Sequence, residues 1–238
     1  MFTLAIDEGG LARLTLDRPE RRNAIPASAW AVLAEHVGAA RAARALVVAG
    51  AGGSFCAGAD LGDFPMMLDE AACFRRAMRA ALDALRDLPI PTVALIDGAC
   101  YGAGVALAMA CDLRLAGADA QFAITPAKIG ISYPQEDVHR LAELVGPGQA
   151  ARLLFTGLSI DGAEAARIGL VETVAPLAER EAAIEAILAN GPESLVTLKR
   201  AIRLAGGGAR TDAGQDHQFD ALLGGAELAR RLEARRRR

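Results

Sequence analysis

The stretch that decides the fold is residues 92–111, with the sequence TVALIDGACYGAGVALAMAC. It begins with the continuous apolar run 92–96, which is typical of a strand buried on both faces. A glycine-rich turn, 97–104, leads into the strongly apolar segment 105–111, which is expected to be a helix. Strand, glycine turn and helix in this order predict an α/β fold with βαβ crossovers and mostly parallel pairing.

The chain before this stretch shows the same pattern. The apolar run 45–49 predicts a second buried strand, and a glycine-rich loop follows it. A helix is expected before this strand, at about 26–43, and another after the loop, at about 69–88. Apolar residues recur at helical spacing in both, and the second helix carries Arg79 and Asp83 on its polar side. Two such units favour a sheet covered by helices.

Shorter strands are expected at both ends of this region. Residues 2–6 and 11–16 alternate with period two around the turn 7–10, which predicts a β-hairpin at the start of the chain. Residues 113–116 and 121–124 are read as two further short strands.

The rest of the chain, from Asp137 onward, reads as almost all helix. We therefore predict a core unit, 1–175, that holds the functional site, and a helical C-terminal region, 176–238, for oligomerisation and for covering the pocket. The chain ends in a run of arginines, 235–238, whose charges are suited to the carboxyl end of a helix.

Composition excludes several classes of function. The 238 residues include 26 Lys plus Arg and 29 Asp plus Glu, with 53% apolar and only 4% aromatic residues. A net charge of −3 and few aromatics argue against nucleic-acid binding, which needs a basic face and stacking platforms. No window of 18 residues lacks both charges and helix breakers, and the first residues carry no basic leader, so we expect no membrane insertion and a cytoplasmic location.

The cysteines and histidines do not suggest a metal site. The four cysteines share no C-x-x-C spacing and are expected to be buried, reduced thiols of the core: Cys56, Cys73, Cys100 and Cys111. The three histidines lie far apart and none is at ligand spacing with a cysteine. We therefore predict neither a metal nor a disulfide.

Two glycine loops are the candidate functional feature. Loop 54–61 and loop 98–104 each follow a buried strand and present backbone N–H groups where a helix is about to start. If the N–H groups of Ala59 and Ala103 converge, they form an oxyanion hole for a thioester or ester carbonyl. Each loop alone could instead be a tight turn selected for steric reasons. A dinucleotide-binding turn is disfavoured, because Leu107 stands where the third glycine is required.

Four segments together resemble the enoyl-CoA hydratase/isomerase (crotonase) superfamily over nearly the whole chain. They are 17–24, 55–61, 102–112 and 155–171. The resemblance implies a crotonase fold of stacked ββα units with a helical C-terminal region that trimerises, giving a homotrimer or a dimer of trimers. It also implies an acyl-CoA substrate and no separate cofactor, since coenzyme A is part of the substrate.

The resemblance also assigns site residues. Ala59 and Ala103 match the two backbone donors of the oxyanion hole, and an alanine at 103 in place of the commoner glycine keeps the donor. The residues expected to contact coenzyme A, with Arg22 assigned to a phosphate, are Arg22, Ala57, Gly58, Ala59, Asp60, Leu61, Gly62 and Gly104.

The chain departs from the family pattern at the acid and base. Hydratases of the family use two glutamates, and the matching positions here are Ala106 and Pro126, which cannot transfer protons. Glu136 and Asp137 are candidate bases and Tyr133 a candidate proton donor. Helix capping by the two carboxylates and a pocket-wall role for Tyr133 stay open. The segment around 125–133 is similar to the methylmalonyl-CoA decarboxylase branch, and a non-catalytic CoA-thioester binder is the alternative of another class.

Overall fold

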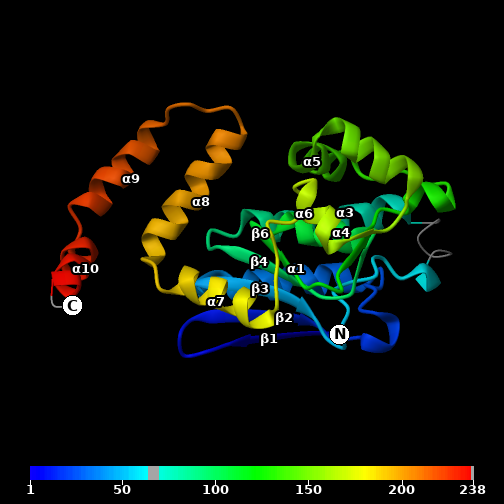
Figure 1. Ribbon diagram of the computed structural model, residues 1–238, viewed down its shortest axis with the longest axis horizontal. Helices are drawn as coiled ribbons and strands as arrows, with labels where there is room; N and C mark the ends of the chain where they lie inside the picture. The colour runs from blue at the N-terminus through cyan, green and yellow to red at the C-terminus, as the bar shows by residue number, and fades with distance from the viewer. Residues whose placement is uncertain (64–69, 237–238) are drawn as a thin grey trace.

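The computed structural model describes residues 1–63 and 70–236, and it contains a six-stranded sheet with helices on both faces (Figure 1). The strand order is β1-β2-β3-β4-β6-β9, in which only the β1–β2 hairpin is antiparallel. This confirms the predicted hairpin and the parallel pairing of the buried strands. The bounds are β1 Phe2–Ile6, β2 Leu11–Leu16, β3 Ala45–Gly50, β4 Thr92–Ile96, β6 Leu113–Ala116 and β9 Thr173–Val174.

A second, three-stranded sheet lies beside the first and has the order β5-β7-β8. Its bounds are β5 Ala99–Tyr101, β7 Gln121–Ala123 and β8 Ile160–Asp161. β5 falls inside the second glycine loop, and an isolated bridge between Cys56 and Cys100 joins the first glycine loop to it. The small sheet therefore brings the two loops into one layer.

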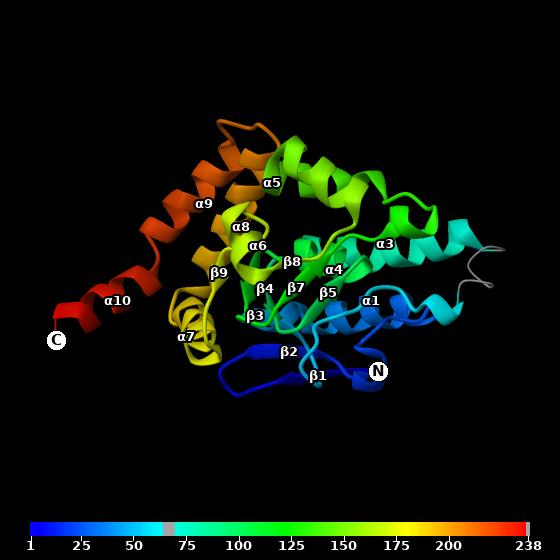
Figure 2. The ribbon, with the colours of Figure 1, turned by 45° about the vertical axis from the view of Figure 1, so that its right-hand side comes forward.

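Helices cover both faces of the large sheet because its strands are apolar on both sides. In β3, Leu46 and Val48 face one way and Ala45 and Val47 the other, as expected for a strand. The first face packs against α1 (Ala29–Ala39), α3 (Ala71–Asp87) and α4 (Ala103–Ala110), with Trp30 fully buried. The second face packs against α7 (Leu177–Leu188) through Ile184. Figure 2 shows α1 and α3 on the same side of the sheet.

The remaining helices lie over the small sheet or extend away from the core. α5 (Gln135–Thr156) and α6 (Gly162–Arg167) lie beside the small sheet, whereas α8 (Pro192–Gly206), α9 (Ala213–Leu223) and α10 (Ala226–Arg236) run along the left of Figure 1. Of these three, α8 contacts the core through its buried Lys199, which donates to the Ile90 carbonyl at 2.9 Å. Short 3-10 turns complete the chain at Pro19–Arg21, Ala40–Ala42, Leu61–Asp63 and Pro126–Ile129. The predicted division after residue 175 stays a prediction, and α7, which follows it, packs on the sheet.

Several sequence predictions are corrected by the structure. β5 was not predicted within its loop, and β8 and β9 interrupt a region expected to be helical, because strands of two or three residues leave no visible alternation. Cys73 is exposed, whereas the other three cysteines are buried free thiols. The predicted helix start at Asp69 and the last two arginines of the 235–238 run lie outside the described residues. Within the described ranges, no helix is long and apolar enough to cross a membrane.

Candidate active site

The two glycine loops are in direct contact. The amide of Cys56 donates to the carbonyl of Ala99 at 2.9 Å, and the amide of Tyr101 donates back to Cys56 at 2.9 Å. Gly58 lies against the second loop, because a Cβ there would lie 2.8 Å from the Tyr101 carbonyl oxygen and 3.3 Å from the amide nitrogen of Ala103. Its φ of +101° also requires glycine. The structure therefore brings together the two segments that the sequence singled out.

The amides of Ala59 and Ala103 have no acceptor within the described part of the protein. Around Ala59, the Ile25 amide donates to Gly58 and the Asp60 amide donates to Ile25, so the Ala59 N–H points away from this pairing. Ala103 is the first residue of α4, where an amide has no partner within the helix. Both amides can therefore donate to a bound molecule, and they lie on loops that touch.

Asn23 anchors the first loop, and sequence reasoning did not assign it this role. It is fully buried and has a positive φ of 58°. Its Nδ2 donates to the carbonyls of Ala51 (2.9 Å) and Ser54 (2.7 Å), and its Oδ1 accepts from the Arg18 amide at 2.8 Å. Asparagine tolerates a left-handed backbone and bonds nearby main chain, which is the signal that could have identified it.

Replacing Asn23 with alanine is expected to lower the free energy of unfolding by about 2–4 kcal/mol, because three half-buried backbone groups lose the fully buried Asn23 side chain as partner, at a left-handed residue. The matched control is Asn190→Ala. The Nδ2 of Asn190 donates to the Ala186 carbonyl at the exposed end of α7, and this substitution should lower the free energy of unfolding by less than about 0.5 kcal/mol. Urea unfolding monitored by circular dichroism measures both. Equal stabilities of the two variants would contradict the anchoring role.

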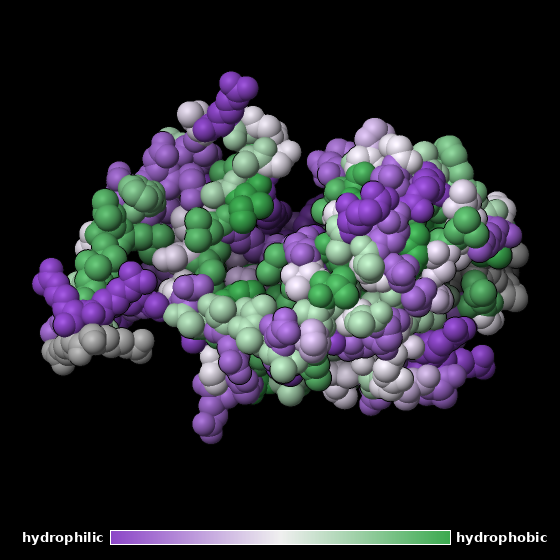
Figure 3. Space-filling model, in the orientation of Figure 1, coloured by the Kyte–Doolittle hydropathy of each residue, from purple (hydrophilic) through white to green (hydrophobic). Residues whose placement is uncertain are grey.

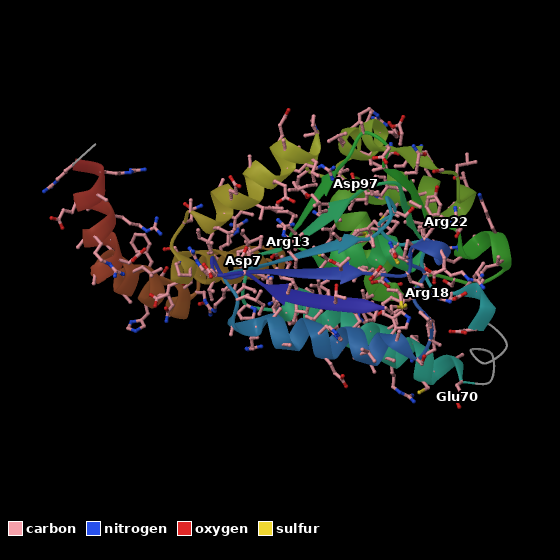
Figure 4. All side chains as sticks on the ribbon, turned by 90° about the horizontal axis from the view of Figure 1, so that it is seen from below. Asp7, Arg13, Arg18, Arg22, Glu70 and Asp97 are labelled. Atoms are coloured by element: carbon pink, nitrogen blue, oxygen red, sulfur yellow. The ribbon has the colours of Figure 1, made fainter. Side chains whose placement is uncertain are left out.

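The predicted coenzyme A residues lie around this loop. Asp60 accepts from the Gly62 amide at 2.9 Å and pairs with Arg18 at 2.5 Å, and these two contacts hold the pKa of its carboxyl below the usual range. Asp60 thus braces the loop. Arg22 is exposed, and its carbonyl accepts from the Ala57 amide at 2.9 Å. Figure 4 shows Arg18 and Arg22 near one end of the sheet, with Asp7 and Arg13 toward the other.

The accessible surface differs among the other residues predicted to contact coenzyme A. Ala57 and Ala59 are half-buried, whereas Leu61 and Gly62 are exposed. Gly104 is buried, and a Cβ there would lie 2.2 Å from the Cys56 carbonyl oxygen. Gly104 therefore permits the close packing of α4 on the first loop.

Tyr133 stands over the first turn of α4. Its hydroxyl donates to the Gly102 carbonyl at 2.9 Å and lies near the amide of Ala106. Burial raises the pKa of this phenol well above its usual value, and the nearby charge of Asp137 adds to the increase. Tyr133 is therefore a neutral hydrogen-bond donor at physiological pH and lies beside the position where a hydratase carries its first glutamate.

Of the two candidate carboxylates, only Asp137 points inward. Asp137 is 3% exposed and pairs with Arg79 of α3 at 2.9 Å, whereas Glu136 is exposed. The Oδ2 of Asp137 is buried without a hydrogen-bond partner in the described ranges. Burial raises the pKa of Asp137, and Arg79 opposes that increase. Its charge also reaches the Tyr133 phenol, so the structure groups the carboxylate and the phenol.

The remaining positions considered from the sequence offer no further group for the site. Ala106 is buried in α4 and Pro126 begins the turn before α5, so neither position offers a proton-transfer group. His139 is exposed and pairs with Glu143 at 3.2 Å. In the described part of the chain, no group of three or more His, Cys, Asp and Glu is placed to hold a metal ion.

Comparison with known proteins gives consistent matches. The sequence model of the enoyl-CoA hydratase/isomerase family matches residues 7–215. A protein of Mycobacterium tuberculosis, named a probable enoyl-CoA hydratase, is 33% identical over 93% of this chain and 90% of its own length. An enoyl-CoA hydratase/carnithine racemase structure from Magnetospirillum magneticum is 30% identical with a TM-score of 0.91, over 99% of this chain and 92% of that one. An enoyl-CoA hydratase structure from Bacillus anthracis is 27% identical with a TM-score of 0.89, and the match covers 99% of this chain and 96% of that one.

Proposed function

The chain belongs to the enoyl-CoA hydratase/isomerase family and has the crotonase fold, and from this premise we propose that it converts an acyl-CoA thioester through an enolate. The observation that carries the proposal is the contact between the two glycine loops, which leaves the amides of Ala59 and Ala103 without protein acceptors. A buried carboxylate, Asp137, and a neutral phenol, Tyr133, complete the arrangement.

In this proposal the thioester oxygen accepts hydrogen bonds from Ala59 and Ala103. Negative charge grows on that oxygen as the enolate forms, and fixed donors stabilise it there more than in the ground state. Tyr133 binds the Gly102 carbonyl and so holds the turn that carries the Ala103 amide. Its hydroxyl stays protonated, so it does not compete for the substrate proton.

Asp137 is the proposed proton-transfer group, and a single carboxylate favours isomerisation over hydration. It takes a proton from C2 of a 3-enoyl thioester, and the C2–H electron pair moves toward the thioester oxygen. The same proton then returns at C4 while the double bond moves to C2–C3, so atoms and charges balance. Hydration needs a second group to activate water, and Ala106 and Pro126 supply none.

Coenzyme A is proposed to lie along the exposed edge of the first loop. Arg22 would pair with a phosphate, and the loop from Ala57 to Gly62 would contact the adenine and pantetheine. Arg18 is already paired with Asp60 and is less available. Coenzyme A is part of the substrate in this proposal, and no separate cofactor is required by the chemistry.

The C-terminal helices are proposed to join copies of the chain into a homotrimer or a dimer of trimers. Figure 3 shows apolar colour along these helices. Their exposed large apolar residues are Val196, Leu198, Ile202, Phe219, Leu223 and Leu232. Such a surface is costly in water unless it is covered. Sedimentation velocity of the full chain tests the assembly, and a monomer at micromolar concentration would contradict it. The cytoplasmic location stays a prediction.

The experiment that tests the function compares three substrates on the full chain: crotonyl-CoA, a 3-enoyl-CoA and methylmalonyl-CoA. Turnover of the 3-enoyl-CoA, at a kcat at least tenfold above that of either other substrate, is the expected result. Methylmalonyl-CoA turnover alone would replace the isomerase proposal by a decarboxylase, which needs the oxyanion hole but no strong base. Tight acyl-CoA binding by calorimetry without turnover of any substrate would identify a non-catalytic binder.

A further inference from the structure

A cavity of about 220 Å³ lies at the carboxyl end of α4 and is lined by four arginines. They are Arg86 of α3, Arg114 of β6, Arg140 of α5 and Arg203 of α8. Figure 3 shows the surface hollowed between α8 and α5. The glycine loops lie at the other end of α4, roughly 12 Å away at 1.5 Å per residue. The cavity is therefore separate from the proposed thioester site.

Two charged residues of this cavity already have protein partners. Arg114 donates to Glu172 and to the carbonyls of Leu170 and Cys111. Asp112 accepts from Thr92 at 2.7 Å and 3.0 Å and pairs with Lys199 at 2.8 Å. Each guanidinium nitrogen of Arg114 therefore already donates to a protein oxygen. The three Asp112 contacts all fall on its Oδ2, where the Lys199 ammonium balances the carboxylate charge.

The other three arginines keep unused donors. Arg140 donates one N–H to the neutral carbonyl of Met109 at 2.9 Å, and its remaining nitrogens have no partner among the described residues. Arg86 and Arg203 share Asp87, at 2.9 Å and 2.7 Å, and Arg86 also reaches Asp83 at 3.2 Å. Arginine guanidinium groups can bind an oxyanion through two parallel hydrogen bonds.

The charges around Arg140 also favour the binding of an anion beside its guanidinium group. Burial and the like charges of Arg86 and Arg79 lower the pKa of its guanidinium, while Asp137 and Asp83 oppose them less strongly. The carbonyl end of a helix normally repels anions. Here the Met109 and Cys111 carbonyls are already bonded to Arg140 and Arg114, which reduces that repulsion.

We propose that this cavity binds a small oxyanion of the phosphate class, inorganic phosphate or a phosphate monoester, through Arg86, Arg140 and Arg203. A volume of about 220 Å³ accommodates a phosphate group with part of a small ester or ordered water. The three arginines come from three helices, so a bound anion would add to the contacts that already join α8 to the core, Lys199 with Asp112 and Arg203 with Asp87.

The site is connected to the proposed catalytic carboxylate by ion pairs. Asp137 pairs with Arg79 at 2.9 Å, Arg79 with Asp83 at 3.0 Å, and Asp83 with Arg86 at 3.2 Å. An anion that draws Arg86 toward the cavity weakens its pairing with Asp83. The binding proposal itself does not depend on the reaction.

The test is calorimetric titration of inorganic phosphate into the full chain at constant ionic strength. All proteins carry Arg22→Gln, so that the proposed coenzyme A phosphate site does not contribute. Saturable binding is expected, and Arg86→Gln and Arg140→Gln should each weaken it at least tenfold. Arg76→Gln is the matched control, because it removes the same charge from an exposed position of α3 and should change the affinity less than twofold.

Methyl phosphate and succinate separate the possible ligands. Methyl phosphate binding as well as phosphate supports a monoester, whereas stronger phosphate binding supports the free ion. No saturable phosphate binding, equal weakening by all three variants, or tighter binding of succinate than of phosphate would each overturn the proposal. If Arg140→Gln lowers the melting temperature strongly, the variants Arg86→Gln, at a half-buried position, and Arg203→Gln, at an exposed one, decide the result.

Discussion

Replacing Ala59 with proline is expected to lower kcat for the preferred acyl-CoA by roughly 10²–10³-fold, the usual cost of removing one oxyanion donor. Proline lacks the N–H, and the Ala59 amide makes no hydrogen bond within the described protein, so the substitution removes a ligand contact rather than one of the fold. Steady-state kinetics should show the loss mainly in kcat, because the interaction strengthens as charge develops on the thioester oxygen.

Ala59→Ser is the matched control, since it changes the side chain at the same position and keeps the amide. Its kcat should stay within a few-fold of the unmodified protein. The melting temperature and the affinity for coenzyme A show whether Ala59→Pro keeps the fold. A correctly folded proline variant with unchanged kcat would remove Ala59 from the proposed oxyanion hole.

Asp137→Asn is expected to lower kcat by about 10²–10⁴-fold, the range for loss of a general acid–base group. Glu136→Gln makes the same chemical change one residue earlier on the exposed side of α5 and should leave kcat within twofold. Equal losses from both variants, or no loss from Asp137→Asn, would show that Asp137 does not transfer the proton.

The pH profile gives an independent measurement of the same group. A base works when deprotonated, so activity should fall as pH drops through the pKa of Asp137, which burial raises above its usual value. Arg79 lowers that pKa, so Arg79→Gln should raise it further and move the acid limb to higher pH. Arg79→Lys keeps a charge and should restore part of the shift. An acid limb that does not move in Arg79→Gln would contradict this assignment.

The parts of the fold that could be predicted from the sequence are those with a long periodic signal. The runs that became β3 and β4 are apolar throughout because both faces are covered, and Trp30, Leu33 and Val37 occur at helical spacing on the buried side of α1. β5, β8 and β9 were missed because two or three residues form a strand only when a distant partner is in place. Cys73 was misplaced because it lies on the exposed side of α3 near its start.

For the candidate site, the sequence indicated which loops meet, while the roles of its residues stay predictions. The glycine turns and the family resemblance pointed to Ala59 and Ala103, and the contact at Gly58 now explains how their loops meet. The choice between Glu136 and Asp137 was not predictable, because adjacent helical residues point about 100° apart and only the packing of α5 on α4, with the ion pair to Arg79 of α3, decides which faces inward. The partner of Arg79 was not predictable either. The sequence places Arg79 on the polar side of its helix, and in the structure it pairs there with Asp137 of α5.

The position of α7 on the large sheet has a consequence for how the chain folds during synthesis. The face formed by Leu11, Val47, Val93 and Leu115 is covered by Ile184 and its neighbours in α7. The edge of β6 is likewise completed only by β9, near residue 174. A nascent chain that has emerged through β6 therefore keeps an unpaired strand edge until β9 follows, nearly sixty residues later, and a bare apolar face until Ile184 of α7 follows, nearly seventy residues later. Ribosomal pausing in this interval would expose the growing protein to aggregation or to chaperones.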